Sequence, residues 1–179
     1  MTEVGSVYGE ALYGLCQEEG LTQAVLSELE VLQMCFQDTP DFIRLLSNPA
    51  LTKAERCGIL DETFRGKIQQ YLLNFLKILT EKGYMRHFAD CCGTYRNCYN
   101  RDHNILPVKA TTATALTKEQ ALRLTEKLSA ITGKTVTITN HVDPEVLGGV
   151  RLTYDGKQLD DTIANRLDSI RSLLKNTVL

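Results

Sequence analysis

The stretch "DPEVLGGVRLTYDGKQLDD", which runs from Asp143 to Asp161, decides how the second half of this chain folds. It holds two adjacent glycines, Gly148 and Gly149, followed at once by apolar residues that alternate with polar ones from Val150 to Tyr154. Such alternation predicts a strand with one face buried. The dipeptide Asp155-Gly156 is a common loop of two-residue β-hairpins, so it predicts a tight turn after that strand.

The glycine pair also has a second interpretation, a loop that cradles phosphate. Such a loop needs glycines after a strand and before a helix, so that amide groups and the helix dipole face the anion. Here Gly148 and Gly149 precede a strand, no GK[ST] follows them, and GxGxxG is absent. We therefore expect a backbone role, a bend or bulge at the entry to the strand. Asp160 and Asp161 are paired carboxylates, and we expect them to cap the start of a helix rather than to catalyse.

The surrounding sequence completes a small mixed domain. The segment "ILPVKATTATAL" from Ile105 is rich in β-branched residues and predicts a strand. A helix is predicted over 116–132, with Thr117 and Gln120 as a capping pair, and "KTVTITNHV" predicts the next strand. After the hairpin, the apolar period predicts a final helix from Asp161 to Leu174. The order is β-α-β-β-α over residues 105–179.

The first part of the chain has helical periodicity almost throughout. Six helices are predicted. The first ends before Gly20, the second covers 21–36, and the third lies between Pro40 and Pro49. The fourth begins at the Thr52/Glu55 capping box, the fifth covers 68–79 before Gly83, and the sixth runs from about Tyr84 to Arg101. Short links between them indicate an antiparallel bundle. The predicted fold is therefore α+β: a six-helix bundle over residues 1–104, followed by the small domain over 105–179.

Composition and charge limit the classes of function that are compatible with this chain. The 179 residues are 43% hydrophobic and 23% charged, as in ordinary globular proteins, and the net charge of -2 does not favour nucleic acid or anionic lipid. The charge is uneven: Met1–Phe64 has eleven acidic and three basic residues, while Arg65–Leu179 has eleven acidic and seventeen basic ones. This asymmetry indicates two surfaces with different partners or two faces that attract each other. No apolar run approaches 18 residues and the N-terminus lacks a basic start, so neither a transmembrane helix nor a signal peptide is expected.

No catalytic set is evident. His87, Cys91 and Cys98 are spaced to share one side of a helix, but a zinc site needs three or four ligands and no second cluster completes this one. We expect these residues to pack, and the six cysteines to be reduced thiols. A nucleophile motif such as GxSxG is absent. The expected site therefore contains no catalytic residue, no metal and no cofactor.

Two apolar helix faces remain without an assigned role. The stretch "VYGEALYGL" carries Tyr8, Ala11, Leu12 and Leu15, with Gly9 and Gly14 on its flanks. The face from Ile68 to Leu79 is wide for a helix in a small bundle. If both faces are partly exposed side by side, they form a groove for a partner helix; the alternative is ordinary core burial.

The chain as a whole resembles the delta subunit of F-type ATP synthase, called OSCP in mitochondria. In the family's C-terminal signature an apolar residue precedes Gly-Gly, a strand follows, then a small turn, then an acid before the last helix. Matching positions here are Leu147, Gly148, Gly149, Val150, Leu152, Gly156, Asp160, Arg166 and Leu167. Three N-terminal blocks also resemble the family: "VYGEALYGL", "LLSNPALTKAERCGIL" and "NFLKILTEKGYM". The chain departs from the family at Asp160-Asp161-Thr162, where Asp-Gly-Ser is frequent, and at Gly9, where alanine is common.

The resemblance implies a function without catalysis. Family members join the α3β3 catalytic head to the b subunits of the peripheral stalk and hold the head still while the central rotor turns. They do so on the cytoplasmic side of the cell membrane, as peripheral parts of the complex without membrane insertion. The N-terminal domain binds the N-terminal helix of an α subunit between the first and fifth helices, and the C-terminal domain contacts the b subunits. Carried over by motif, the groove candidates are Tyr8, Ala11, Leu12, Leu15, Phe75, Ile78 and Leu79, and the structural signature residues are Gly148, Gly149, Gly156 and Asp160.

RNA binding and small-ligand catalysis are the two alternative functions. A β-α-β-β-α domain with a basic balance is compatible with RNA binding, but the predicted strands lack an aromatic stacking set and no GxxG loop lies between helices. A small-ligand enzyme would need a polar pocket with perturbed ionisable groups, and the sequence indicates none. The interpretation that we favour therefore names protein partners and no nucleic acid.

Overall fold

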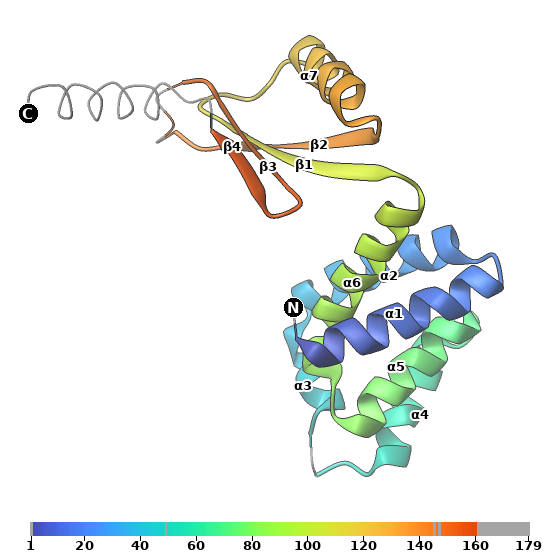
Figure 1. The fold of residues 1–179 in the computed structure, drawn as a ribbon. Coiled ribbons are helices and arrows are strands. Elements are labelled where there is room, and N and C mark those ends of the chain that lie inside the picture. Colours follow the sequence, from blue (N-terminus) through green and yellow to red (C-terminus); the bar gives the residue numbers. More distant parts are fainter. Residues whose placement is uncertain (1, 49, 145, 147, 161–179) are drawn as a thin grey trace, which may run out of the picture. The chain divides into compact units, whose positions relative to one another are not determined.

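The computed structural model describes residues 2–48, 50–144, 146 and 148–160 (Figure 1). The chain divides into two compact units between Tyr99 and Asn100, a few residues before the expected boundary at Asn104 and Ile105. Helices make up the first unit, and a sheet with one described helix makes up the second, so the fold is α+β.

The first unit is a series of helices joined by short links. They are α1 (Glu3–Glu18), α2 (Thr22–Asp38), α3 (Pro40–Leu46), α4 (Lys53–Phe64), α5 (Gln70–Lys82), the 3₁₀ turn η1 (Met85–His87) and α6 (Phe88–Asp102). The helix expected to start at Tyr84 therefore begins with a separate 3₁₀ turn, and its α-helical part starts at Phe88.

Local signals in the sequence explain several of these boundaries. Thr52 accepts a hydrogen bond from the Glu55 amide, and the Glu55 carboxylate accepts one from the Thr52 amide at 2.8 Å, which is the predicted capping box of α4. Pro40 stands at the start of α3, where its missing N–H costs nothing. Gly83 ends α5 in the left-handed conformation.

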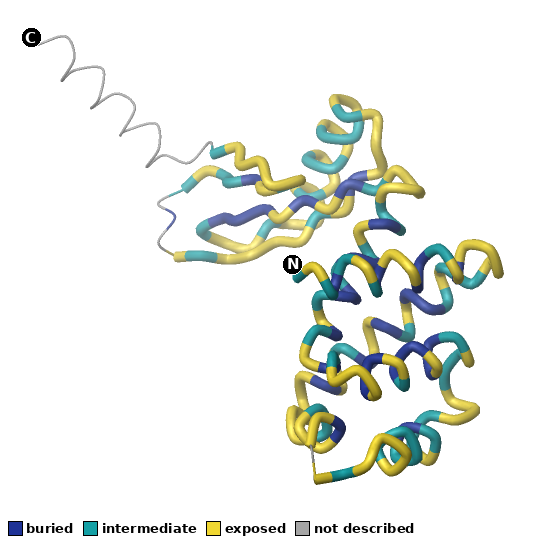
Figure 2. The backbone as a smooth tube through the Cα atoms, turned by 60° about the horizontal axis from the view of Figure 1, so that its bottom comes forward, coloured by how far each residue is buried: buried dark blue, intermediate teal, exposed yellow. Residues whose placement is uncertain are grey.

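The core of the first unit is continuous across these helices. Fully buried leucines of α4 and α5 meet those of α2, and Tyr95 of α6 is 0% exposed among them. The Tyr95 hydroxyl donates a hydrogen bond to the Thr22 carbonyl at 3.0 Å, so its one polar atom is satisfied. Figure 2 shows how buried and exposed positions are distributed along the helices. Burial on this scale is the main contribution to the stability of the unit.

Helix α1 lies beside both α5 and α6 in the first unit. Two glycines of α1, Gly5 and Gly9, are buried against the first two turns of α6. The other side of α1 faces α5 (Figure 1). This helix therefore has one side fixed by backbone packing and another that borders a groove.

The second unit is a four-stranded sheet with order β2-β1-β3-β4 among the described residues. Its elements are β1 (Ile105–Thr112), α7 (Lys118–Thr132), β2 (Thr135–Val142), β3 (Val150–Tyr154) and β4 (Lys157–Asp160). Strand β2 pairs parallel to β1, as expected when a helix connects them, while β3 and β4 are antiparallel to their neighbours. The predicted capping box of α7, Thr117 with Gln120, is present.

One face of this sheet is the core of the second unit. Leu106, Val108, Ala110, Val136 and Leu152 are buried there, and Leu124 and Leu128 of α7 pack against them. On the opposite face, the described strands carry mainly threonines with Lys109, Arg151 and a single His141, but no Phe, Tyr or Trp. A stacking platform for RNA bases needs aromatic side chains, so this face does not favour the RNA-binding interpretation.

The opening stretch folds as a hairpin. Asp155 and Gly156 have φ of 45° and 71° and connect Tyr154 to its partner Lys157, as the two-residue loop requires. Gly148 and Gly149 have φ of 137° and 88° and stand directly before β3, which agrees with a backbone role.

The end of the hairpin differs from the expectation. Residues 157–160, which the expected order does not count as an element, form a fourth strand, because they pair with residues 151–154 of β3. Asp160 lies in that strand, and its carboxylate accepts a hydrogen bond from Arg151 Nε at 2.9 Å across the ladder. The predicted final helix, 161–174, lies outside the described residues.

Candidate binding groove

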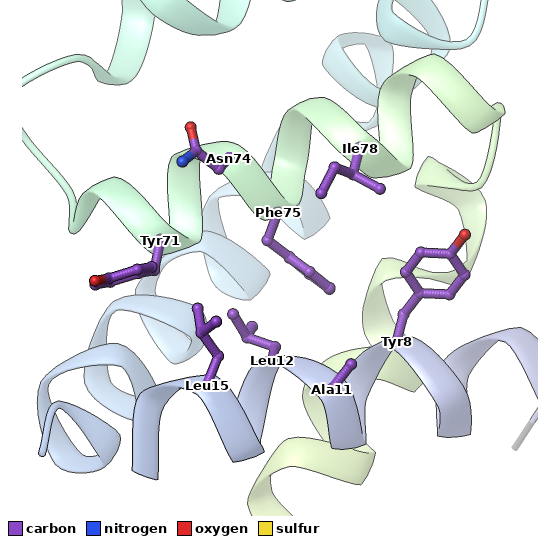
Figure 3. A pocket seen from close by; sticks show the side chains of 8 residues that line it. All are labelled: Tyr8, Ala11, Leu12, Leu15, Tyr71, Asn74, Phe75 and Ile78. Atoms are coloured by element: carbon purple, nitrogen blue, oxygen red, sulfur yellow. The ribbon is translucent and has the colours of Figure 1, made fainter. Parts of the chain in front are cut away.

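A groove of about 450 Å³ lies between α1 and α5 (Figure 3). Helix α1 contributes Tyr8, Ala11, Leu12 and Leu15, and α5 contributes Tyr71, Asn74, Phe75 and Ile78. Both sets follow the spacing i, i+3, i+4, i+7, so each is one stripe of its helix. The groove is therefore built from two facing helical stripes of equal length.

The floor and the rims of the groove differ in burial. Leu12 and Phe75 are 5% and 6% exposed and form the floor between the helices. Leu15 and Ile78 stand on opposite walls and are 42% and 45% exposed. Large apolar side chains exposed on both sides of a concave surface indicate a binding site for another apolar surface.

Two residues that line the groove, Tyr8 and Tyr71, also make contacts outside it. The rings of Tyr8 and Tyr84 meet edge to face, with centroids 5.9 Å apart. Towards the C-terminus of α1, the Tyr71 hydroxyl donates a hydrogen bond to the Glu19 carboxylate, which raises the pKa of Tyr71. These contacts join α1 to α5 and to the segment that follows α5.

Polar atoms in the groove are few. Asn74 Oδ1 accepts a hydrogen bond from Gln70 Nε2 at 3.0 Å, so the Asn74 amide group is left to donate towards a partner. The hydroxyl groups of Tyr8 and Tyr71 are the other polar atoms at the walls. A partner surface is therefore expected to be mainly apolar, with an acceptor that reaches Asn74.

Six of the seven groove residues expected from the sequence line this one groove, and Leu79 does not. Leu79 is 0% exposed and packs in the core, on the apolar stripe of α5 next to the one that lines the groove. Tyr71 and Asn74 were missing from the expected set. The spacing of Phe75 and Ile78, extended backwards by one turn, would have identified both.

The candidate metal cluster is not assembled. His87 Nδ1 lies 3.3 Å from Thr2 Oγ1, and its Nε2 accepts a hydrogen bond from Arg86, while Cys91 and Cys98 are buried in the core. Burial raises the pKa of Cys91 to about 11 and that of Cys92 to about 12, so both thiols stay protonated at neutral pH. Over the described ranges, no three His, Cys, Asp or Glu side chains come together as a metal site requires.

Comparisons with known proteins agree with this picture. The family model for the ATP synthase delta (OSCP) subunit matches residues 4–174. The ATP synthase subunit delta of Alkaliphilus oremlandii is 32% identical over 98% of this chain and 98% of its own, and that of Clostridioides difficile is 31% identical over 98% and 97%. In a cryo-EM structure of the Toxoplasma gondii mitochondrial ATP synthase hexamer, one chain has the same fold, with a TM-score of 0.76 at 18% identity, over 97% of this chain and 98% of that one.

An α+β chain that is matched over nearly its full length by subunits of ATP synthase is itself a subunit of a larger assembly. It belongs to the ATP synthase delta (OSCP) subunit family, whose members are peripheral-stalk subunits of ATP synthase. In the part of the chain that the structure describes, the helices are too short or too polar to cross a membrane.

Proposed function

We propose that the groove between α1 and α5 binds the N-terminal helix of an α subunit of the catalytic head. The observation that carries this proposal is the pair of facing i, i+3, i+4, i+7 stripes, which leaves an apolar groove open between two helices. An amphipathic helix presents its own stripe at the same spacing, so its apolar side chains interleave with both walls. Helices α1 to α6 act in this proposal as one six-helix bundle.

The second unit contacts the b subunits of the peripheral stalk in the same proposal. The chain then joins the α3β3 head to the stalk and keeps the head from turning with the central rotor, at the cytoplasmic side of the membrane. Gly148, Gly149, Gly156 and Asp160 serve this role indirectly, because they shape the hairpin of β3 and β4. Resistance to torque requires tight non-covalent contacts, and a preformed groove provides them with little ordering cost.

Calorimetry with a synthetic peptide of the α subunit's N-terminal helix tests the proposal. The wild-type chain is expected to bind, and Ala11→Asp or Ile78→Asp is expected to weaken binding by about a hundredfold or more, because a carboxylate would be buried in an apolar groove. Met34→Asp is the matched control, since Met34 is an exposed apolar residue of α2 that does not line the groove. Circular dichroism would confirm that each variant folds.

Two results would count against the proposal. One is a folded wild-type chain that does not bind the peptide. The other is an Ala11→Asp variant that binds as tightly as Met34→Asp does.

A further inference from the structure

Two glycines of α1 allow it to pack closely against α6. A Cβ atom on Gly9 would lie 2.7 Å from both the Cys91 carbonyl oxygen and Thr94 Cβ. A Cβ atom on Gly5 would lie 2.5 Å from Asp90 Cβ. Non-bonded carbon atoms rest at about 3.5–4.0 Å, so any side chain at either position forces α1 away from α6. At Gly9 one of the opposing atoms is backbone, which cannot rotate aside.

Hydrogen bonds fasten the same end of α1 to α6. Asp90 Oδ2 accepts hydrogen bonds from the Thr2 hydroxyl at 2.8 Å and from the Thr2 amide at 3.3 Å. The Thr2 oxygen in turn accepts one from the Gly5 amide and so caps α1. The first turns of α1 are therefore held against α6 both by contact and by hydrogen bonds.

The position of α1 on α6 also sets the position of one groove wall. Gly9 directly follows Tyr8, about 100° further round the helix, so the residues that touch α6 and those that line the groove belong to the same turns. If α1 shifts on α6, then Tyr8, Ala11 and Leu12 shift with it relative to the wall on α5. A few tenths of an ångström matter here, because packed side chains interdigitate with little free space.

We propose that Gly5 and Gly9 are positioning residues of the groove: they let α1 settle directly on the α6 backbone and so fix how its wall faces α5. The proposal rests on the proposed function only for the identity of the partner helix. It assigns to α1 two sides with separate roles, one that places the helix and one that binds.

A third glycine of α1 provides a matched control. Gly14 is half-buried, but a Cβ atom there would have no neighbour within 4 Å. Gly9→Ala and Gly14→Ala thus add the same methyl group to the same helix and raise helix propensity equally. Only the first adds it at the contact with α6.

The first measurement is the methyl NMR signal of Ile78 in the full chain. Ile78 lies on the α5 wall, and neither substitution touches it. Gly9→Ala is expected to move this signal, whereas Gly14→Ala leaves it at the wild-type position. Gly5→Ala is the second variant at the same contact between α1 and α6, because its added Cβ atom would lie 2.5 Å from Asp90 Cβ.

The second measurement is affinity for the α-subunit peptide, measured on fully folded protein. Gly9→Ala is expected to bind about tenfold more weakly than Gly14→Ala. Leu46→Val controls for a general loss of stability, because Leu46 is a fully buried residue of α3 and does not line the groove. A destabilised variant that still folds should keep the wild-type affinity if its groove is intact.

The outcomes of the two measurements distinguish the positioning role of the glycines from the proposed partner. An unmoved Ile78 signal in both Gly9→Ala and Gly5→Ala would overturn the positioning role, whatever the peptide does. A wild-type chain that does not bind the peptide would instead contradict the proposed partner, and the Ile78 signal would still decide the role of the glycines. If the peptide binds the wild type, equal affinities of Gly9→Ala and Gly14→Ala for it would also overturn the positioning role of the glycines.

Discussion

Ile78 and Leu79 are neighbours in the chain, yet α5 places them in different environments. Ile78 is 45% exposed on the rim of the groove, whereas Leu79 is 0% exposed in the core. Successive side chains on a helix differ in direction by about 100°, so Ile78 borders the groove while Leu79 packs in the core.

Alanine at each of these two positions should therefore have opposite consequences. Leu79→Ala is expected to lower the free energy of unfolding by about 2–5 kcal/mol, because it leaves a cavity in a packed core. Ile78→Ala is expected to cost less than about 1 kcal/mol but to weaken binding of the α-subunit peptide by about tenfold. Urea denaturation and calorimetry measure the two effects. Equal losses of stability in both variants would contradict the assignment of the two faces of α5.

At the scale of elements, an ion pair connects α4 to the groove wall. Lys77 Nζ of α5 lies 2.7 Å from Asp61 Oδ1 of α4, and Arg65 lies 3.4 Å from the same oxygen. The hydrogen bond from Lys77 holds the pKa of the Asp61 carboxyl below its ordinary value, and the positive charges of Lys77 and Arg65 act in the same direction.

This lowered pKa predicts a pH-dependent contribution to stability. Asp61 is ionised in both the folded and the unfolded chain above its ordinary pKa, so the full contribution is present at neutral pH. It is lost as the pH falls through the lowered pKa of the folded state. Asp61→Asn should thus have a lower melting temperature than the wild type at pH 7, and the difference should vanish towards about pH 2. A difference that stays constant over this range would show that the ion pair contributes nothing.

Local signals determined most of the elements in advance. The capping boxes at Thr52 and Thr117 and the Asp155-Gly156 turn were predicted from their residues and are present in the structure. These features depend on a few neighbouring residues, so sequence alone is sufficient. The extent of β4 was not predicted, because a four-residue strand depends on the ladder that it joins.

The groove could be predicted only in part, because α5 is apolar on more than one side. Leu72, Leu73, Leu76 and Leu79 face the core while Phe75 and Ile78 border the groove, and periodicity alone does not separate two adjacent apolar stripes. Tyr71 and Asn74 lie one turn before Phe75 and Ile78 on the same stripe, outside the apolar residues from which the groove was predicted. The contact of Gly9 with α6 is a tertiary contact, so no local sequence pattern predicts it.

In the molecule as a whole, the two units have different surface features. The helical unit carries the groove, and the second unit presents a one-sided sheet with α7 on its buried face. Family membership covers both units, since the match extends over residues 4–174. The first unit has thirteen acidic and nine basic residues over 1–99, and the second has nine acidic and eleven basic ones over 100–179, which is consistent with different partners for the two units.

Photo-crosslinking in the intact ATP synthase tests the central claim most directly. A photoreactive amino acid in place of Asn74 lies within the groove, and the same amino acid in place of the exposed Lys53 of α4 serves as the control. If the groove holds the N-terminal helix of an α subunit, position 74 crosslinks to that helix and position 53 does not. A crosslink from position 74 to another subunit, or none in an assembled and active complex, would contradict the account.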